Sequence, residues 1–284
     1  PAGQLSLVLH AHLPFVRHPE HPVFLEENWL FEAMIESYIP LVDMLGRLQA
    51  DGIDIRLGLG LSPTLCEMLS DDLLRERFAA RLDALIDLSR KELDRTQPHP
   101  EFHRTAVLYN RHFERAKVVF EETFGRDLLS AFRAFQEAGT LEIICCPATH
   151  AFLPLLVNRR AIRAQLRMGI RNYRRHFGCE PRGLWLPECA YVPGLDEELA
   201  AENLRYFFLD SHGILFGTPR PKYGIFAPVL CRSRVAVFGR DIESSKQVWS
   251  SQTGYPGDPE YREFYRDLGF DAPLEEVAPY LHPD

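Results

Sequence analysis

The feature that most constrains the fold is a repeated order of short apolar run, polar terminus and helical pattern. Apolar runs at 5–9, 53–61, 141–146, 183–186, 204–209 and 235–238 have the length and composition of buried strands. Stretches with apolar residues at helical spacing separate most of these runs. Because a helical crossover returns the chain to the same end of a sheet, this order predicts parallel strands. We therefore predict an α/β fold, built as a barrel or an open parallel sheet.

Polar side chains stand where the predicted strands end. His10 and His12 close the first run, His150 follows the third, Glu188 the fourth and Asp210 the fifth. His10 and His12 are separated by one residue, so on a strand both project to the same side. In parallel α/β folds ligands bind at the carboxyl ends of the strands. We therefore expect these groups to converge on one mouth.

Glu188 is the strongest candidate for chemistry. Pro187 cannot extend the ladder of strand hydrogen bonds, which places Glu188 at the strand's C-terminal end. A carboxylate between Trp185 and Tyr191 suits a nucleophile that attacks a sugar held against aromatic faces. The alternative is a strand-end glutamate that caps a neighbouring helix.

Retaining chemistry on a glycoside also needs a second carboxyl group, about 5–5.5 Å away, as proton donor. Asp210 and Asp241 both follow predicted strands. Each is also suited to binding sugar hydroxyls or pairing with an arginine. Spacing along the sequence does not choose between these roles.

The three histidines have three interpretations. Imidazoles at strand ends can be zinc ligands in a site of three or four groups. They can instead bind sugar hydroxyls and position a carboxylate. The third interpretation is that His10, His12 and His150 are structural.

Composition excludes several classes of partner. The net charge of −8 and pI near 5.8 exclude a nucleic-acid partner, since phosphate binding needs an excess of clustered Lys and Arg. Six cysteines without C-x-x-C spacing indicate reduced core residues. No leader pattern and no run long enough to span a bilayer occur, so we expect a cytoplasmic protein without a membrane partner. Nothing indicates an oligomeric state.

Helix boundaries have clear signals. Ser62 precedes Pro63 at a helix start, and Ser70 offers a capping hydroxyl ahead of two acids. Gly139 and Gly178 are placed to end helices. Pro40 predicts a kink in the helix that covers residues 30–45.

The segment after residue 213 is rich in aromatic residues and broken by Gly and Pro, which predicts loops and no long helix. Rings beside polar strand ends can form a carbohydrate subsite, because sugar C–H faces pack on aromatic rings. The alternative is a hydrophobic cluster that covers the barrel. The aromatic residues concerned are Trp249, Tyr255, Tyr261, Phe264 and Tyr265.

Several motifs together resemble glycoside hydrolase family 57, and within it the 1,4-α-glucan branching enzymes. They cover nearly the whole chain in the family's order, and the last is specific to that subgroup. The motifs are His10-Ala11-His12-Leu13-Pro14, Ala148-Thr149-His150, Trp185-Leu186-Pro187-Glu188, and the run from Phe238-Gly239-Arg240-Asp241 through Gln247-Val248-Trp249-Ser250 to Gly254-Tyr255-Pro256-Gly257-Asp258.

The resemblance implies a distorted (β/α)7 barrel. Residues 1–284 would be its N-terminal catalytic portion, within which residues 213–284 form an aromatic-rich part that lines the cleft. It implies retaining transglycosylation of an α-1,4-glucan segment to a 6-hydroxyl, with hydrolysis as the alternative within the family. Glu188 matches the nucleophile. No cofactor and no catalytic metal are implied. The implied substrate-binding residues are His10, His12, His150, Arg240, Trp249 and Gly257, to which we add Trp185 and Asp210 from their positions at the strand ends.

The sequence departs from the family pattern in two ways. The acid/base aspartate belongs to a downstream motif of the type Tyr-Asp-x-Glu-Leu-Phe-Gly-His-Trp-Trp, which is absent here. We therefore expect residues 1–284 to be the part of a longer enzyme that precedes its C-terminal helical region. The alternative is an inactive glucan-binding fragment. Cys189 and Ala151 replace the commoner Met and Gly, which we expect to be tolerated.

Overall fold

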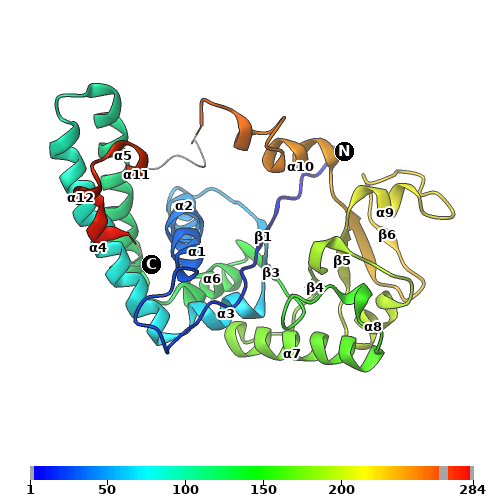
Figure 1. Ribbon diagram of the computed structural model, residues 1–284. Helices are drawn as coiled ribbons and strands as arrows, with labels where there is room; N and C mark the ends of the chain where they lie inside the picture. Colours follow the sequence, from blue (N-terminus) through cyan, green and yellow to red (C-terminus); the bar gives the residue numbers. More distant parts are fainter. Residues whose placement is uncertain (1–2, 262–267, 282–284) are drawn as a thin grey trace.

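The computed structural model describes residues 3–261 and 268–281, and it has the predicted α/β fold (Figure 1). One sheet contains β1 (Val8–Ala11), β2 (Leu57–Leu61) and β3 (Leu141–Ile144), in that order. The second has the order β4-β5-β7-β6, with β4 (Gly183–Leu184), β5 (Tyr206–Leu209), β6 (Val229–Leu230) and β7 (Ala236–Gly239). A parallel bridge between Cys145 and Leu184 joins the sheets. Only β6 is antiparallel among the described strands, an arrangement consistent with a (β/α)7 barrel.

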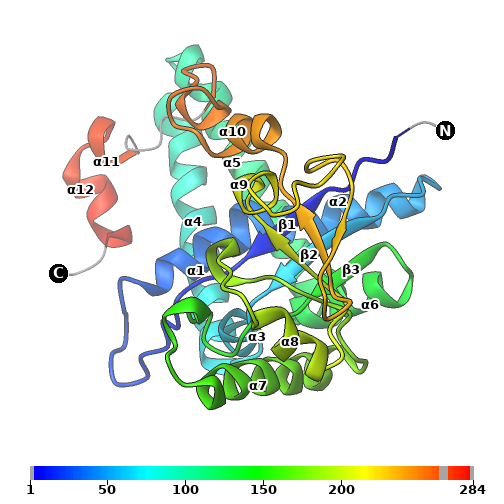
Figure 2. The same ribbon diagram turned by 90° about the vertical axis from the view of Figure 1, so that its right-hand side faces the viewer.

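Helices connect the parallel strands and surround them. In both views α7 and α10 lie on opposite sides of the strands (Figures 1 and 2). In Figure 1, α4 and α5 form a helical arm beside α1. The helical elements are α1 (Glu27–Ala33), η1 (Met34–Tyr38), α2 (Ile39–Ala50), α3 (Pro63–Leu69), α4 (Asp72–Thr96), α5 (Pro100–Lys117), η2 (Val118–Thr123), α6 (Leu128–Glu137), η3 (Leu153–Leu155), α7 (Arg159–Phe177), η4 (Pro187–Cys189), α8 (Leu195–Ala201), α9 (Ser211–Leu215), α10 (Ile242–Trp249), η5 (Tyr255–Gly257), α11 (Leu268–Asp271), α12 (Leu274–Val277) and η6 (Ala278–Tyr280).

Strand alternation separates the core from the barrel lumen. A side chain added at Gly58 would meet Val8 and Ile144, and one added at Gly60 would meet His10, so these positions share one face. The opposite face of β2, with Leu57, Leu59 and Leu61, is buried in the hydrophobic core. On the lumen side a cavity of about 910 Å³ opens toward the amino ends of the strands, between residues that include Val8, Tyr206 and Phe238.

The first predicted strand differs from the observed one. β1 begins at Val8 and includes His10, whereas Leu5, Leu7 and Leu9 are 84%, 54% and 43% exposed. In the described part of the chain, no layer covers the face on which Leu7 and Leu9 lie. The second strand is also shorter than predicted, because Ile53 is exposed and pairing starts at Leu57.

Most predicted helix boundaries are confirmed. Ser62 Oγ accepts a hydrogen bond from Leu65 N at the start of α3, and Gly139 and Gly178 adopt positive φ after α6 and α7. The cap of α4 is Asp71, whose Oδ1 accepts from Leu74 N at 3.1 Å, so the prediction of Ser70 was wrong.

The helix continues through Pro40, with the π-helical turn η1 immediately before it. Pro40 has no N–H to donate to the preceding turn, and its ring crowds the carbonyl four residues earlier. A wider turn relieves this crowding. The expected disturbance at Pro40 is therefore a local widening of the helix.

All six cysteines are free thiols, as predicted. Cys66, Cys145, Cys146 and Cys189 are buried. Cys179 is exposed and Cys231 half-buried, so the expectation that all six lie in the core was wrong. In the described part of the chain, no helix is long and apolar enough to cross a membrane.

Candidate functional site

Four rings from three strand ends form a stacked row. Trp185 stacks on His10 with centroids 4.4 Å apart and planes 10° from parallel. His150 follows, 5.0 Å from His10, and His12 lies 3.8 Å from His150. The predicted convergence of the imidazoles is therefore confirmed by their geometry. Because stacked rings cover one another's faces, the row can offer a sugar ring only the outer faces of its end members, Trp185 and His12.

His10 lies closest to Trp185 and is the most perturbed histidine. Gly60 leaves room for it, since a Cβ there would lie 2.7 Å from His10 Nδ1. Burial, aided by the neighbouring histidines and Arg240, lowers the pKa of His10 to about 3. Its two ring nitrogens are buried without a hydrogen-bond partner among the described residues. An unpaired buried polar group costs roughly 1–3 kcal/mol, so these nitrogens are available to a ligand.

His12 is oriented by the end of the neighbouring strand. Its Nδ1 lies 3.0 Å from Ser62 Oγ, the hydroxyl that also caps α3. Burial lowers the pKa of His12, and the negative charge of Glu188 acts in the opposite direction. That electrostatic coupling places the carboxylate of Glu188 near the imidazole of His12.

His150 sits on a strained turn. Its φ is +54°, which is uncommon outside glycine. Gln165 from α7 holds this turn, because its side chain accepts from Thr149 N at 3.0 Å and donates to Thr149 Oγ1 at 2.9 Å. Burial lowers the pKa of His150 to about 4. Strain at a turn that other groups hold in place is common at ligand sites.

Glu188 follows β4 in η4, as the position of Pro187 predicts. Its φ is +54°, and that of Cys189 is +52°. The side chain is exposed. Among the described residues, no group forms a hydrogen bond or ion pair with the Glu188 carboxylate. It therefore does not cap a helix, and the strained turn presents it to solvent beside the ring row.

Arg240 and Asp210 approach the same turn. Arg240 follows β7, and its Nη1 lies 3.9 Å from the Cys189 sulfur. Burial raises the pKa of the Cys189 thiol, and the negative charges of Asp210 and Glu188 raise it further. The positive charge of Arg240 acts in the opposite direction. Arg240 thus contacts this thiol, and the charges of Asp210 and Glu188 act on it. Asp210 is exposed, 3.9 Å from His212 Nδ1.

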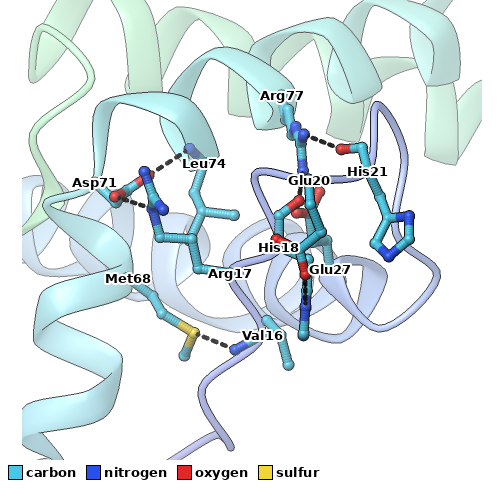
Figure 3. Close-up of polar contacts among 10 residues, drawn as sticks. All are labelled: Val16, Arg17, His18, Glu20, His21, Glu27, Met68, Asp71, Leu74 and Arg77. Carbon is cyan, nitrogen blue, oxygen red and sulfur yellow. Dashed lines mark hydrogen bonds and ion pairs between the residues drawn. The ribbon is translucent and has the colours of Figure 1, made fainter.

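The loop that leaves β1 is held against α4 (Figure 3). Arg77 donates to the carboxylate of Glu27, which is only 2% exposed, and to the carbonyl of His21. Arg17 pairs with Asp71 at 2.5 Å. The arm therefore fixes the segment that follows His12.

The other predicted site residues have local surroundings of their own. Trp249 ends α10 and is 76% exposed, and no ring contact between described residues joins it to the row. Gly257 packs against Ser251, where a Cβ would lie 1.9 Å from the carbonyl oxygen. Asp241 Oδ1 accepts from Ser244 N at 2.8 Å, which makes it the cap of α10. Phe264 and Tyr265 lie outside the described residues.

The sequence did not reveal four supporting residues. In the sequence, Ser62 shows only that a helix begins there, and Gln165 is only one position of a helix. In the structure Ser62 contacts His12, and Gln165 holds the turn that precedes His150. Cys189 contacts Arg240, and Cys146 lies beside His10 and His150. Each depends on contacts between segments far apart in the sequence.

Comparison with known proteins supports the resemblance. The family model for glycosyl hydrolase family 57 matches residues 6–281. A 1,4-alpha-glucan branching enzyme of Thermococcus kodakarensis is 35% identical over 93% of this chain and 42% of its own length. A probable 1,4-alpha-glucan branching enzyme of Mycobacterium tuberculosis is 30% identical over 98% of this chain and 56% of its own. The chain thus spans about half the length of the curated relatives it matches.

Solved structures are also similar to this chain, among them an alpha-amylase and a branching enzyme. The alpha-amylase AmyC from Thermotoga maritima superposes with a TM-score of 0.93 and 47% identity, over 99% of this chain and 54% of the other. A branching enzyme from Pyrococcus horikoshii gives a TM-score of 0.85 and 36% identity, over 93% and 51%. With the family match over nearly all of its length and a shared fold, this chain belongs to glycosyl hydrolase family 57.

Proposed function

We propose that this chain is the catalytic-barrel portion of a 1,4-α-glucan branching enzyme, in which Glu188 is the nucleophile. The observation that carries the proposal is the exposed Glu188 on a strained turn beside the stacked row of Trp185, His10, His150 and His12. The similarity to branching enzymes at 30–36% identity supports it.

In the proposed reaction a glucose unit of an α-1,4-glucan packs against the ring row. A Glu188 carboxylate oxygen attacks the anomeric carbon, the bond from that carbon to the 4-oxygen breaks, and an acid protonates the leaving oxygen. A 6-hydroxyl then attacks the same anomeric carbon and loses its proton to the group that acted as the acid. The bond from that carbon to Glu188 breaks, which frees the carboxylate and leaves the α-1,6 linkage. Two inversions at one carbon retain its configuration.

The surrounding residues have distinct proposed roles. Neutral His10 and His150 offer a donor and an acceptor each, which suits sugar hydroxyls. Arg240 and Asp210 reach the same turn and are proposed to bind hydroxyls flanking the reacting carbon. Asp241 is engaged as a helix cap, so we assign it no acid role. The acid/base is proposed to belong to the motif that the resemblance places outside residues 1–284.

Residues 213–284 are proposed to line the cleft and to shield the glycosyl ester from water. Trp249 and Tyr255 support this role, because 76% and 52% of their surfaces are exposed and free to pack on glucan. Favouring a 6-hydroxyl over water requires such shielding. An α-1,4-glucan partner and a cytoplasmic location are part of the same proposal.

The test replaces Glu188 with Gln in the intact gene product and counts α-1,6 linkages formed from amylose. We expect branching to fall by about 10⁴-fold or more, because the amide cannot form the ester. Glu180→Gln is the matched control, since Glu180 is exposed and pairs only with Arg174 among the described groups. Branching retained by Glu188→Gln would refute the assignment.

Hydrolysis is a second candidate, favoured by the 47% identity to an alpha-amylase. The ratio of new α-1,6 linkages to released reducing ends separates the two activities. A ratio well above one supports branching, and reducing ends without new linkages support hydrolysis. Binding of maltooligosaccharides without turnover by the intact gene product would instead indicate a glucan-binding protein.

A further inference from the structure

Three side chains of the kinds that bind metals lie close together at the ends of β1 and β3, two of them in the ring row and one beside it. One ligand atom each from His10, Cys146 and His150 lies within 4.8 Å of the other two. Zinc binds nitrogen at about 2.0–2.1 Å and thiolate sulfur at about 2.3 Å, so tetrahedral ligands lie about 3.3–3.6 Å apart. The three atoms therefore lie at most about 1.5 Å further apart than zinc ligands do, a gap that the side chains would close on binding.

The unpaired nitrogens of this cluster are a second, independent observation. Both ring nitrogens of His10 and Nδ1 of His150 are buried without hydrogen-bond partners in the described part of the chain. A neutral imidazole nitrogen without a hydrogen-bond partner presents a free lone pair, which a cation can take. A sugar hydroxyl can also pair with an imidazole.

Cys146 distinguishes between a metal ion and a sugar as the ligand of this cluster. A thiol forms only weak hydrogen bonds, so it adds little to sugar binding. As a thiolate it is a strong ligand for soft cations and, with two imidazoles, completes a three-ligand set of the kind found in zinc sites. The sulfur is fully buried beside both histidines, where nothing in the proposed sugar chemistry uses it.

We propose that His10, Cys146 and His150 bind one zinc ion, and that the bound ion excludes glucose from the ring row. The two imidazoles and one thiolate leave a fourth coordination position for water. Binding transfers the Cys146 thiol proton to solvent as the sulfur–zinc bond forms, so affinity rises with pH. The exclusion part rests on the proposed function, because it requires that His10 and His150 contact the sugar.

Metal stoichiometry tests the site directly. The intact gene product is stripped with a chelator, dialysed against zinc chloride and analysed for bound metal. It is then loaded with cobalt, whose thiolate complex has a charge-transfer absorption band. We expect one zinc per chain and a cobalt–thiolate band, with the band lost and zinc affinity at least roughly a hundredfold lower in both Cys146→Ala and Cys146→Ser.

Cys145→Ala is the matched control, since Cys145 is the adjacent and equally buried thiol outside the three-residue set. It should keep the band and the stoichiometry. Circular dichroism confirms that each variant is folded, and the serine variant retains nearly the shape of the thiol. Absence of the band in the parent protein, or its survival in folded Cys146 variants, would overturn the site.

Calorimetry with maltoheptaose tests exclusion separately. Zinc should weaken maltoheptaose binding at least tenfold in the parent protein and leave it unchanged in Cys146→Ala. Equal affinity with and without bound zinc would refute exclusion while the metal site stands. If maltoheptaose does not bind the metal-free protein, the proposed function fails, and metal stoichiometry still decides the zinc site.

Discussion

Acid should destabilise this protein through its buried neutral histidines, and His10→Asn should reduce that effect. Burial lowers the folded-state pKa of His10 to about 3, against about 6.5 in the unfolded chain. Below pH 6.5 the unfolded state binds a proton that the folded state does not. Stability therefore falls as pH decreases from about 6.5 toward the folded pKa. Each pH unit in this window costs about 1.4 kcal/mol for one histidine.

Between pH 6.5 and 4.5 the loss attributable to His10 is thus about 2.3 kcal/mol, because the unfolded imidazole is already half protonated at pH 6.5. The pH range ends well above the folded-state pKa of His10, so a folded-state pKa one unit higher would change this free-energy loss little. His150, with a pKa of about 4, contributes similarly and remains in the variant.

Urea unfolding measured at several pH values, with a chelator present, gives the slope of the unfolding free energy against pH. The slope should be smaller by about one proton in His10→Asn. Parallel curves for the two proteins, or an NMR titration of His10 near pH 6.5, would refute the burial of a neutral imidazole.

Three substitutions test other parts of the structure. Arg77→Met should lower the unfolding free energy by about 3–5 kcal/mol in denaturant titrations, because it leaves the buried Glu27 carboxylate without its partner. Gly60→Ala should displace the His10 ring, seen as altered Trp185 fluorescence and weaker maltoheptaose binding, since the new Cβ lies 2.7 Å from Nδ1. Trp185→Ala should weaken maltoheptaose binding about tenfold by calorimetry, because the sugar loses a stacking surface.

Matched changes elsewhere should have little effect. Arg90→Met removes an exposed ion pair with Glu114, where we expect at most about 1 kcal/mol. Gly46→Ala places a Cβ in open space inside α2 and should stabilise the helix slightly. If Arg90→Met destabilises as much as Arg77→Met, burial of the ion pair is not the cause. If Gly46→Ala weakens maltoheptaose binding like Gly60→Ala, contact with His10 is not the cause.

The sequence predicted the parts of the fold that depend on local pattern. The parallel strands, the helix ends at Ser62 and Gly178 and the convergence of the three histidines follow from periodicity and from polar residues at strand ends. The order of the strands in the sheets and the antiparallel β6 were not predicted. The exposure of Leu5 and Leu7 did not follow, because an apolar run does not show whether a covering layer lies beside it.

The supporting contacts of the site were also beyond sequence reasoning. Gln165 lies in α7 and holds the turn before His150 across the fold. Cys146 approaches His10 only because β2 sets β1 and β3 at a fixed spacing. Glu188 was predicted from its place after Pro187, whereas its positive φ depends on packing that the sequence does not display.

The central claim is that the Glu188 carboxylate forms the bond to glucose. A fluorinated maltosyl fluoride that forms the glycosyl ester but reacts slowly afterwards would trap it on the intact gene product. Peptide mass spectrometry should then find one sugar on the peptide that contains Glu188, and none in Glu188→Gln. A sugar attached to any other residue, or turnover of this reagent by Glu188→Gln, would contradict the account.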